Sequence, residues 1–311
     1  MIQDVAGSNP VSRPSTKDAT EALLGGVVLE RIWPKDRELP PMHVLALQYA
    51  PTWHGKPASH AIVEAMVEAS DAPEGTLVVL PEMSDCGWTM DTEAATRGDS
   101  LGWAAACARR WGMSVQIGFA RRVARAPGHA NATAIVHPDG RIGPVYEKMH
   151  PFGFTDEPRF YAAGTEIVLD HVEDFGIAPS ICYDLRFPEL HRLAVAGGAE
   201  VLSIIANWPT ARIEHWRALV IARAIENQAF VIAVNRVGSD PSHRYGGCSM
   251  LVSPLGEVLA ESGDEPTTLE ADFDRTGLLE YRARFPALAD RRSDLLDGER
   301  IARISNPATD V

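Results

Sequence analysis

Short apolar runs alternate with amphipathic stretches through most of this chain. Helical spacing of the apolar positions predicts helices over residues 58–70, 100–111, 189–196 and 213–228, of which the last is the longest. Runs of Val, Ile, Leu and Ala predict strands over residues 42–50, 76–80, 114–119, 131–137, 141–146, 166–170, 175–182, 201–206, 230–237, 249–252, 257–260 and 268–273. The alternation of the two kinds of element indicates an α/β protein.

Two turns divide this pattern into similar halves. HPDG at 137–140 and SPLG at 253–256 each join two predicted strands, and each follows two strand–helix pairs. We therefore expect two similar halves, each a sheet with helices on one side. The two sheets would pack face to face in one α/β domain.

The ends of the chain differ from its middle. Residues 1–41 mix Ser, Pro, Thr and Gly with little periodicity, which predicts a poorly ordered or loosely docked N-terminal extension. Translation could instead begin at Met42, where the first clean strand starts. The main domain is expected over 42–280. The Arg-rich tail at 281–311 is either a segment that wraps a partner subunit, at a dimer interface, or a solvated end.

Composition restricts the kinds of partner. The 311 residues are 45% hydrophobic and 23% charged, which suits one large globular domain or two small ones. A net charge of −13 argues against nucleic acid, because phosphate contacts need clustered Lys and Arg. No apolar run approaches the roughly 18 residues of a membrane span. A small-molecule substrate and no membrane partner are predicted.

Cysteine usage and motifs predict the compartment and the cofactors. The four cysteines form no CxxC pair, and the N-terminus lacks the pattern of a signal peptide. We expect free thiols in a reduced, cytoplasmic protein. The sequence contains no HExxH, no GxGxxG and no P-loop, so neither a metal nor another cofactor is predicted.

A cysteine stands where a predicted strand turns into a helix. The apolar run 177–181 ends on Cys182, a polar cluster follows, and Pro188 opens the next helix. This placement puts the thiol at the carboxyl edge of a sheet, where backbone N–H groups can face a developing oxyanion. Cys182 is therefore a candidate nucleophile. The alternative is a buried structural cysteine.

Two further polar residues follow predicted strands. Glu82 comes directly after a core strand and Pro81, where burying a carboxylate costs free energy, and it suits a general base. Lys148 lies among aromatic and apolar neighbours, and an ammonium group near Cys182 would lower the pKa of the thiol and stabilise an oxyanion. Either residue could instead lie on the surface. Together, a base, a cation and a thiol suit acyl transfer through a thioester.

The segments around these residues resemble the nitrilase, or carbon–nitrogen hydrolase, superfamily. The match consists of LVVLPEM around Glu82, YEKMHPF around Lys148 and ICYDLRFPEL around Cys182. ANWPTARIEHWRALVIARAIENQAFVIAVNRVGSD at 206–240 and the hairpin SMLVSPLGEVLAE resemble the ω-amidase branch in particular. The resemblance covers roughly residues 42–275.

The resemblance implies a four-layer α-β-β-α sandwich and a homodimer or higher oligomer formed through helices. The helix after Cys182 and the helix at 213–228 are the matching candidates for the dimer contact. The latter carries an apolar stripe, which would face either a partner or the core of the same chain; its residues are Ala218, Ile221, Ala222 and Ile225.

The resemblance also assigns roles to residues. Cys182 would attack an amide carbonyl, and Glu82 would take the thiol proton and later activate water. Lys148 and the backbone N–H of Tyr183 would hold the oxyanion. A second glutamate of the family matches Glu157, with Asp156 as the neighbouring alternative.

The implied substrate of an ω-amidase is a short 2-oxo acid amide, such as 2-oxoglutaramate or 2-oxosuccinamate. Its carboxylate would need a cation, for which Arg186 is the candidate unless it pairs with Glu189 or Asp184. Three aromatic residues are candidate pocket walls, namely Phe152, Trp208 and Tyr245.

The sequence is also compatible with other functions. Within the superfamily the chain could hydrolyse deaminated glutathione or an N-carbamoyl amide, whereas nitrile hydrolysis is less expected. Outside it, the chain could be a binding protein without activity. A cysteine–histidine hydrolase would need His150 or His215 as its base.

Overall fold

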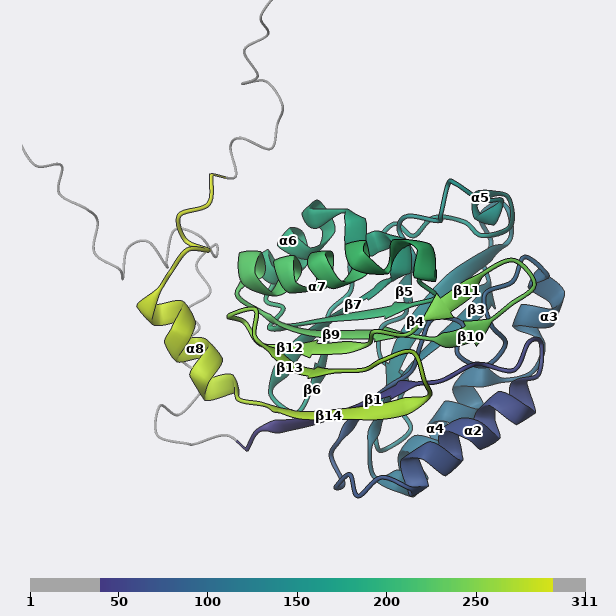
Figure 1. The fold of residues 1–311 in the computed structure, drawn as a ribbon, viewed down its shortest axis with the longest axis horizontal. Helices are drawn as coiled ribbons and strands as arrows, with labels where there is room; N and C mark the ends of the chain where they lie inside the picture. Colours follow the sequence, from purple (N-terminus) through teal and green to yellow (C-terminus); the bar gives the residue numbers. More distant parts are fainter. Residues whose placement is uncertain (1–39, 293–311) are drawn as a thin grey trace, which may run out of the picture. The chain divides into compact units, whose positions relative to one another are not determined.

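Two six-stranded sheets pack face to face, and helices cover their outer surfaces (Figure 1). The computed structural model describes residues 40–292. Most of the predicted N-terminal extension and most of the predicted C-terminal tail lie outside these residues. Helix α8, Arg275–Arg284, runs across the expected boundary between residues 280 and 281.

The first sheet has the strand order β14-β1-β2-β3-β4-β5. Its strands are β1 Met42–Gln48, β2 Leu77–Val79, β3 Ser114–Arg122, β4 His129–Val136, β5 Tyr146–Glu147 and β14 Thr267–Phe273. β1, β2 and β3 are parallel, and the other neighbours are antiparallel. The parallel strands read as continuous apolar runs because both of their faces are covered.

The second sheet has the order β13-β12-β9-β8-β7-β6. Its strands are β6 Asp170–Val172, β7 Phe175–Ile181, β8 Val201–Ala206, β9 Phe230–Asn235, β12 Met250–Val252 and β13 Val258–Glu261. β7, β8 and β9 are parallel and form the centre of this sheet. A separate small ribbon pairs β10, Val237–Ser239, with β11, Arg244–Gly246.

Alternate residues of β1 belong to different hydrophobic clusters. Val44 and Ala46 join the core between the two sheets, whereas Leu45 and Leu47 pack with helices α2, Lys56–Glu68, and α4, Ser100–Trp111. This alternation follows from the period of two residues along a strand. Helices α6, Pro188–Ala196, and α7, Ile213–Asn227, cover the second sheet. The layers therefore run helix, sheet, sheet, helix.

Short elements complete the chain. They are α3 Thr92–Thr96, α5 Glu157–Phe160 and the 3₁₀ helices η2 Cys182–Arg186 and η3 Thr210–Arg212. Most of them lie in loops that the sequence pattern left unassigned.

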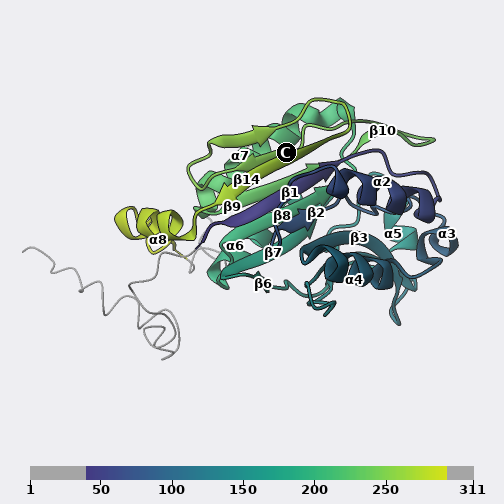
Figure 2. The ribbon, with the colours of Figure 1, turned by 90° about the horizontal axis from the view of Figure 1, so that it is seen from below.

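The predicted α/β sandwich is confirmed, with one difference in its division into halves. β14 comes from the second half of the sequence but pairs antiparallel with β1 along seven residues, from Met42↔Phe273 to Gln48↔Thr267 (Figure 2). β1 would otherwise be an edge strand with unpaired backbone groups. The last strand of the chain therefore completes the first sheet.

Two predicted strands were wrong in their bounds. The strand expected at 166–170 is β6, which begins at Asp170, because the tight turn after Val172 fixes its register against β7. Of the strand expected at 141–146, only an isolated bridge at Ile142 and the two residues of β5 are present. The HPDG turn itself is formed, with Gly140 at a φ of 82°.

The apolar stripe predicted on α7 faces the core only in part. Trp216, Val220 and Ala224 are buried on the inner face of this helix, together with Arg223 and Asn227. Ala218 and Ile225 are exposed, and Ile221 and Ala222 are half-buried. Ile221 packs against the core of the same chain, whereas Ala218 and Ile225 face outward, so the stripe is divided between the two alternatives.

Candidate active site

Cys182 stands at a strained turn between β7 and η2. Its φ of 52° lies in the left-handed region, which residues other than glycine rarely adopt. The buried carboxylate of Asp184 fixes this turn by accepting hydrogen bonds from Ile181 N (3.0 Å), His150 N (2.9 Å) and the Tyr146 hydroxyl (2.7 Å). The sequence therefore folds locally so that the thiol points out of the end of the sheet.

Glu82 is fully buried just beyond β2 and is held by both sheets. Asn131 Nδ2 and Lys148 Nζ donate to its Oε1 at 2.6 and 2.9 Å. The backbone N–H of Asn207, directly after β8, donates to its Oε2 at 2.7 Å. A carboxylate with this many donors is fixed in one rotamer and one orientation.

Lys148 bridges two glutamates. Its Nζ lies 2.9 Å from Glu82 Oε1 and 3.0 Å from each carboxylate oxygen of Glu157. Glu157 is buried at the start of α5 and also accepts from Phe152 N at 2.6 Å. Asp156, the alternative considered from the sequence, instead pairs with Arg159 at 3.0 Å on the surface. The structure thus brings Glu157, and not Asp156, to the lysine.

These charges shift two pKa values. Burial alone would lower the pKa of Lys148, but Glu157 and Glu82 outweigh it and hold the pKa well above 10.5. Burial and then Glu82 raise the pKa of Cys182 well above 9.0, although Lys148 acts in the opposite direction. Lys148 thus lowers the pKa of the thiol as expected, but burial and Glu82 are the stronger influences and the net shift is upward.

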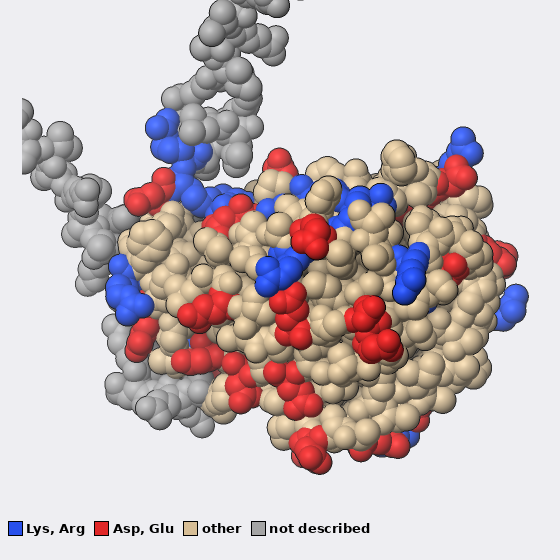
Figure 3. Space-filling model, viewed as in Figure 1, with Lys and Arg blue, Asp and Glu red and all other residues tan. Residues whose placement is uncertain are grey.

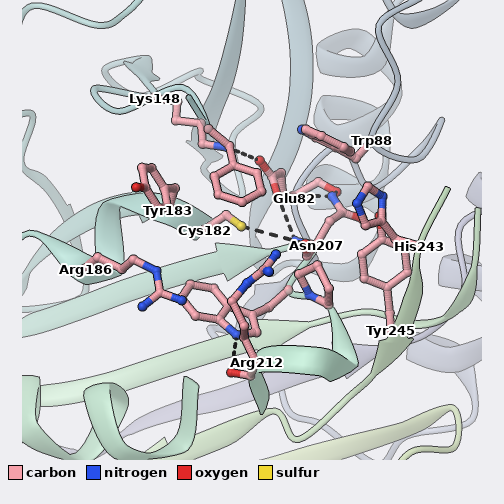
Figure 4. A pocket seen from close by; sticks show the side chains of 13 residues that line it. Glu82, Trp88, Lys148, Cys182, Tyr183, Arg186, Asn207, Arg212, His243 and Tyr245 are labelled. Atoms are coloured by element: carbon pink, nitrogen blue, oxygen red, sulfur yellow. Dashed lines mark hydrogen bonds and ion pairs between the residues drawn. The ribbon is translucent and has the colours of Figure 1, made fainter. Parts of the chain in front are cut away.

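A pocket opens above Cys182, Glu82 and Lys148 (Figure 4). All five residues expected to bind substrate or the oxyanion line it, namely Phe152, Tyr183, Arg186, Trp208 and Tyr245. Its aromatic walls are braced by one another, since the ring of Phe152 lies 4.9 Å from that of Tyr183. The Tyr183 N–H is in the first turn of η2, where a backbone donor has no acceptor within the helix.

Arg186 does not form the ion pairs that were its alternative role. Its guanidinium lies over the ring of Trp208, 4.7 Å from the centroid, and contacts His215 Nδ1 at 3.4 Å. Asp184 is turned inward and accepts a hydrogen bond from the backbone N–H of Ile181. No salt bridge between Arg186 and Glu189 is present in the described part of the chain.

Neither histidine of the alternative mechanism lines the pocket. His150 Nδ1 bonds Asp184 at 2.7 Å, and its ring stacks on Phe187 at 3.7 Å. His215 lies exposed on α7 beside Arg186. Of the three candidate bases, Glu82 is the one that lines the pocket with Cys182.

Comparison with known proteins identifies this arrangement. The family model described as "Carbon-nitrogen hydrolase" matches residues 44–283. This chain belongs to the carbon–nitrogen hydrolase family. The family, the sandwich fold and the enzyme class predicted from the sequence are thereby confirmed.

Individual relatives of this carbon–nitrogen hydrolase are similar over most of their length. A 2-oxoglutaramate amidase of Bacillus subtilis is 36% identical over 78% of this chain and 95% of its own. Omega-amidase YafV of Escherichia coli K12 is 34% identical over 81% of this chain and 97% of its own. The crystal structure of XC1258 from Xanthomonas campestris, a CN-hydrolase superfamily protein with an arsenic adduct in its active site, has a TM-score of 0.75. It is 31% identical and covers 82% of this chain and 98% of its own.

Several residues in and around this pocket were not predicted from the sequence. Asn207 directly follows β8, as Glu82 follows β2, so the same strand-end argument could have found it. Asn131 lies inside β4, where only its polarity in an apolar strand was a signal. Three more residues reach the pocket from loops or short helices that periodicity does not reveal, namely Trp88, Arg212 and His243.

Residues 40–292 lack two further features. No group of three or more His, Cys, Asp or Glu side chains is placed to hold a metal ion there. Within the same residues, no helix has the length and apolar character needed to cross a membrane.

Proposed function

We propose that this carbon–nitrogen hydrolase cleaves the terminal amide of a small 2-oxo acid amide, of the 2-oxoglutaramate or 2-oxosuccinamate type, to an acid and ammonia. The observation that carries the proposal is the buried Glu82–Lys148–Glu157 cluster at the base of the same pocket as Cys182. The names of the two amidase relatives support the substrate class.

The first half-reaction forms a thioester. Glu82 takes the proton of the Cys182 thiol while the sulfur attacks the amide carbon. Lys148 and the N–H of Tyr183 stabilise the oxygen that becomes negative. The C–N bond then breaks, the proton on Glu82 passes to the nitrogen, and ammonia leaves.

The second half-reaction uses water. Glu82 takes a proton from water, and the hydroxyl group adds to the thioester carbon. The C–S bond breaks, the proton on Glu82 returns to the sulfur, and the carboxylic acid leaves. Glu157 keeps Lys148 charged and in place throughout.

The raised pKa of Cys182 explains why the base must be adjacent. Because burial and Glu82 raise the pKa of the thiol, attack by the sulfur requires a neighbouring group that takes the proton. Glu82, fixed by Lys148, Asn131 and Asn207, is the group that the geometry offers for that proton.

The test measures ammonia released from 2-oxoglutaramate by the purified protein. Cys182→Ala should lower the rate by more than about 1,000-fold, because the nucleophile is lost. Retained activity in this variant would exclude the thioester mechanism. Glu82→Gln should also be inactive, whereas His150→Ala should still release ammonia; the reverse pattern would favour the cysteine–histidine reading.

A substrate panel separates the alternatives within the superfamily. Deaminated glutathione, N-carbamoyl amino acids and a nitrile, each scored for ammonia, compete with the 2-oxo amides. We expect the highest kcat/KM with a 2-oxo amide.

We also propose that the enzyme is a cytoplasmic homodimer that binds neither nucleic acid nor membranes. The exposed part of the stripe on α7 supports the dimer, since the apolar side chain of Ile225 is 51% exposed. The net charge of −13 supports the absence of a nucleic-acid partner. Light scattering should give twice the mass of one chain, and Ile225→Glu should shift that value toward the monomer.

A further inference from the structure

Two arginines share one side of the pocket. Figure 4 shows Arg186 and Arg212 near each other, away from Trp88 and His243 on the opposite side. The Arg212 guanidinium lies 5.4 Å from the centroid of the Phe152 ring, as Arg186 lies over Trp208. Each guanidinium is thus supported by an aromatic face, which fixes its plane without neutralising its charge.

Within residues 40–292, neither guanidinium has a salt bridge to an Asp or Glu side chain. Lys148, which also lines the pocket, is by contrast paired with two glutamates. Partial burial lowers the pKa of Arg186, and the charge of Arg212 lowers it further, so the two groups repel each other. Figure 3 shows acidic side chains scattered over the outer face of a chain whose net charge is −13.

Two neighbouring cations without a counter-ion are unfavourable in a partly desolvated pocket. A bound anion would relieve that repulsion. Guanidinium groups match a carboxylate especially well, because their planar N–H donors bond both of its oxygens. The pocket thus has one region for the amide, at Cys182, and a second region for a negative charge.

We propose that Arg212 is a specificity-determining residue that binds the carboxylate of the substrate together with Arg186, so that the enzyme selects amides with an anionic far end. This inference rests on the proposed function and adds to it a residue and a rule of selection. Arg212 precedes α7, and its backbone carbonyl accepts a hydrogen bond from Trp208 Nε1 at 2.7 Å. The Arg212 side chain takes no part in this bond. Replacing the side chain therefore leaves this anchor of the pocket wall in place.

The experiment compares two probes of similar size. Succinamate has a carboxylate at its far end, and butyramide has a methyl group there. Binding is measured by nuclear magnetic resonance titration in Cys182→Ala, which cannot turn either probe over, with and without Arg212→Met. We expect Arg212→Met to raise the dissociation constant of succinamate by about 10- to 100-fold, which is the effect of losing a charged hydrogen bond. The dissociation constant of butyramide should change by less than about 2-fold.

Turnover by protein with intact Cys182 gives the second readout. Arg212→Met should raise KM for succinamate while kcat changes little, and Arg212→Lys should fall between the wild type and Arg212→Met, because it keeps the charge but loses the planar donors. Arg217→Met is the matched control, since Arg217 is an exposed arginine of α7 that already pairs with Glu261 at 2.8 Å. Arg217→Met should change neither the binding nor the turnover of either probe.

Three results would overturn the inference: equal weakening of both probes, no weakening of succinamate, or a wild-type preference for butyramide. These results are distinct from failure of the proposed function. If no amide is hydrolysed in a manner that depends on Cys182, the proposed function fails, while the titration with Cys182→Ala still decides whether Arg212 binds an anion.

Discussion

Lys148 and Arg212 are cations of the same pocket in opposite surroundings. Lys148 is buried and lies within 3.0 Å of carboxylate oxygens from Glu82 and Glu157. Arg212 rests on an aromatic ring beside a second positive charge. One cation has its counter-ions within the protein, and the other has none in the described part of the chain.

This difference suggests separate functions for the two cations, one in the reaction and one in the recognition of substrate. A buried charge with complete partners holds its protonation state and position whether or not a ligand is bound. A charge without a partner changes its interactions when an anion arrives. Lys148 therefore suits a constant role in each catalytic cycle, and the arginine pair suits the recognition of one class of substrate.

The largest expected effect is on the free energy of unfolding, when the same substitution is made at Lys148 and at Arg212. Lys148→Met leaves two buried carboxylates without their cation and should lower the free energy of unfolding by about 3–5 kcal/mol. Arg212→Met removes one of two repelling charges at a half-buried position and should change it by less than about 1 kcal/mol. Urea unfolding followed by tryptophan fluorescence measures both. Equal losses of stability in the two variants would show that Lys148 is no better compensated than Arg212.

A smaller effect concerns the thiol itself. Glu82→Gln should lower the pKa of Cys182, because Glu82 raises it and Lys148, which remains, lowers it. Titration of the thiolate ultraviolet absorbance, with the signal of Cys182→Ala subtracted, measures the change.

In the wild type the raised pKa of Cys182 contributes stability that is present below about pH 9 and is lost as the pH rises through the folded-state pKa. An unchanged titration in Glu82→Gln would show that burial alone sets the pKa.

The sequence was most informative where a polar residue ends an apolar strand. Glu82 and Cys182 follow core strands, and Lys148 follows the short β5, so a simple rule about the carboxyl edges of sheets found them. Glu157 came only from the family resemblance, because a carboxylate in a Pro-containing loop has no periodic signal. Arg212 lay inside the stretch that resembles the ω-amidases, but its position beside Arg186 depends on the packing of η3 against the pocket.

The differences from the sequence predictions have physical causes of a different kind. The sign of the pKa shift of Cys182 depends on a competition between burial, Glu82 and Lys148, whose outcome requires three-dimensional positions. The stripe of α7 was ambiguous because the inner face of this helix is partly polar, with Arg223 donating to Leu185 O at 2.7 Å and Asn227 to Arg223 O at 3.0 Å. Local patterns do not reveal such bonds.

The pairing of β1 with β14 has a consequence for the order of events during synthesis. Met42 and Phe273 are partners in one ladder, although most of the described chain separates them. During translation, β1 and its neighbour β2, which leads to Glu82, are made long before the strand that covers their edge. Contacts this distant in sequence form slowly. We therefore expect the nascent chain to expose an unpaired edge of β1 until residue 273 has left the ribosome, a period in which a chaperone would protect it from aggregation.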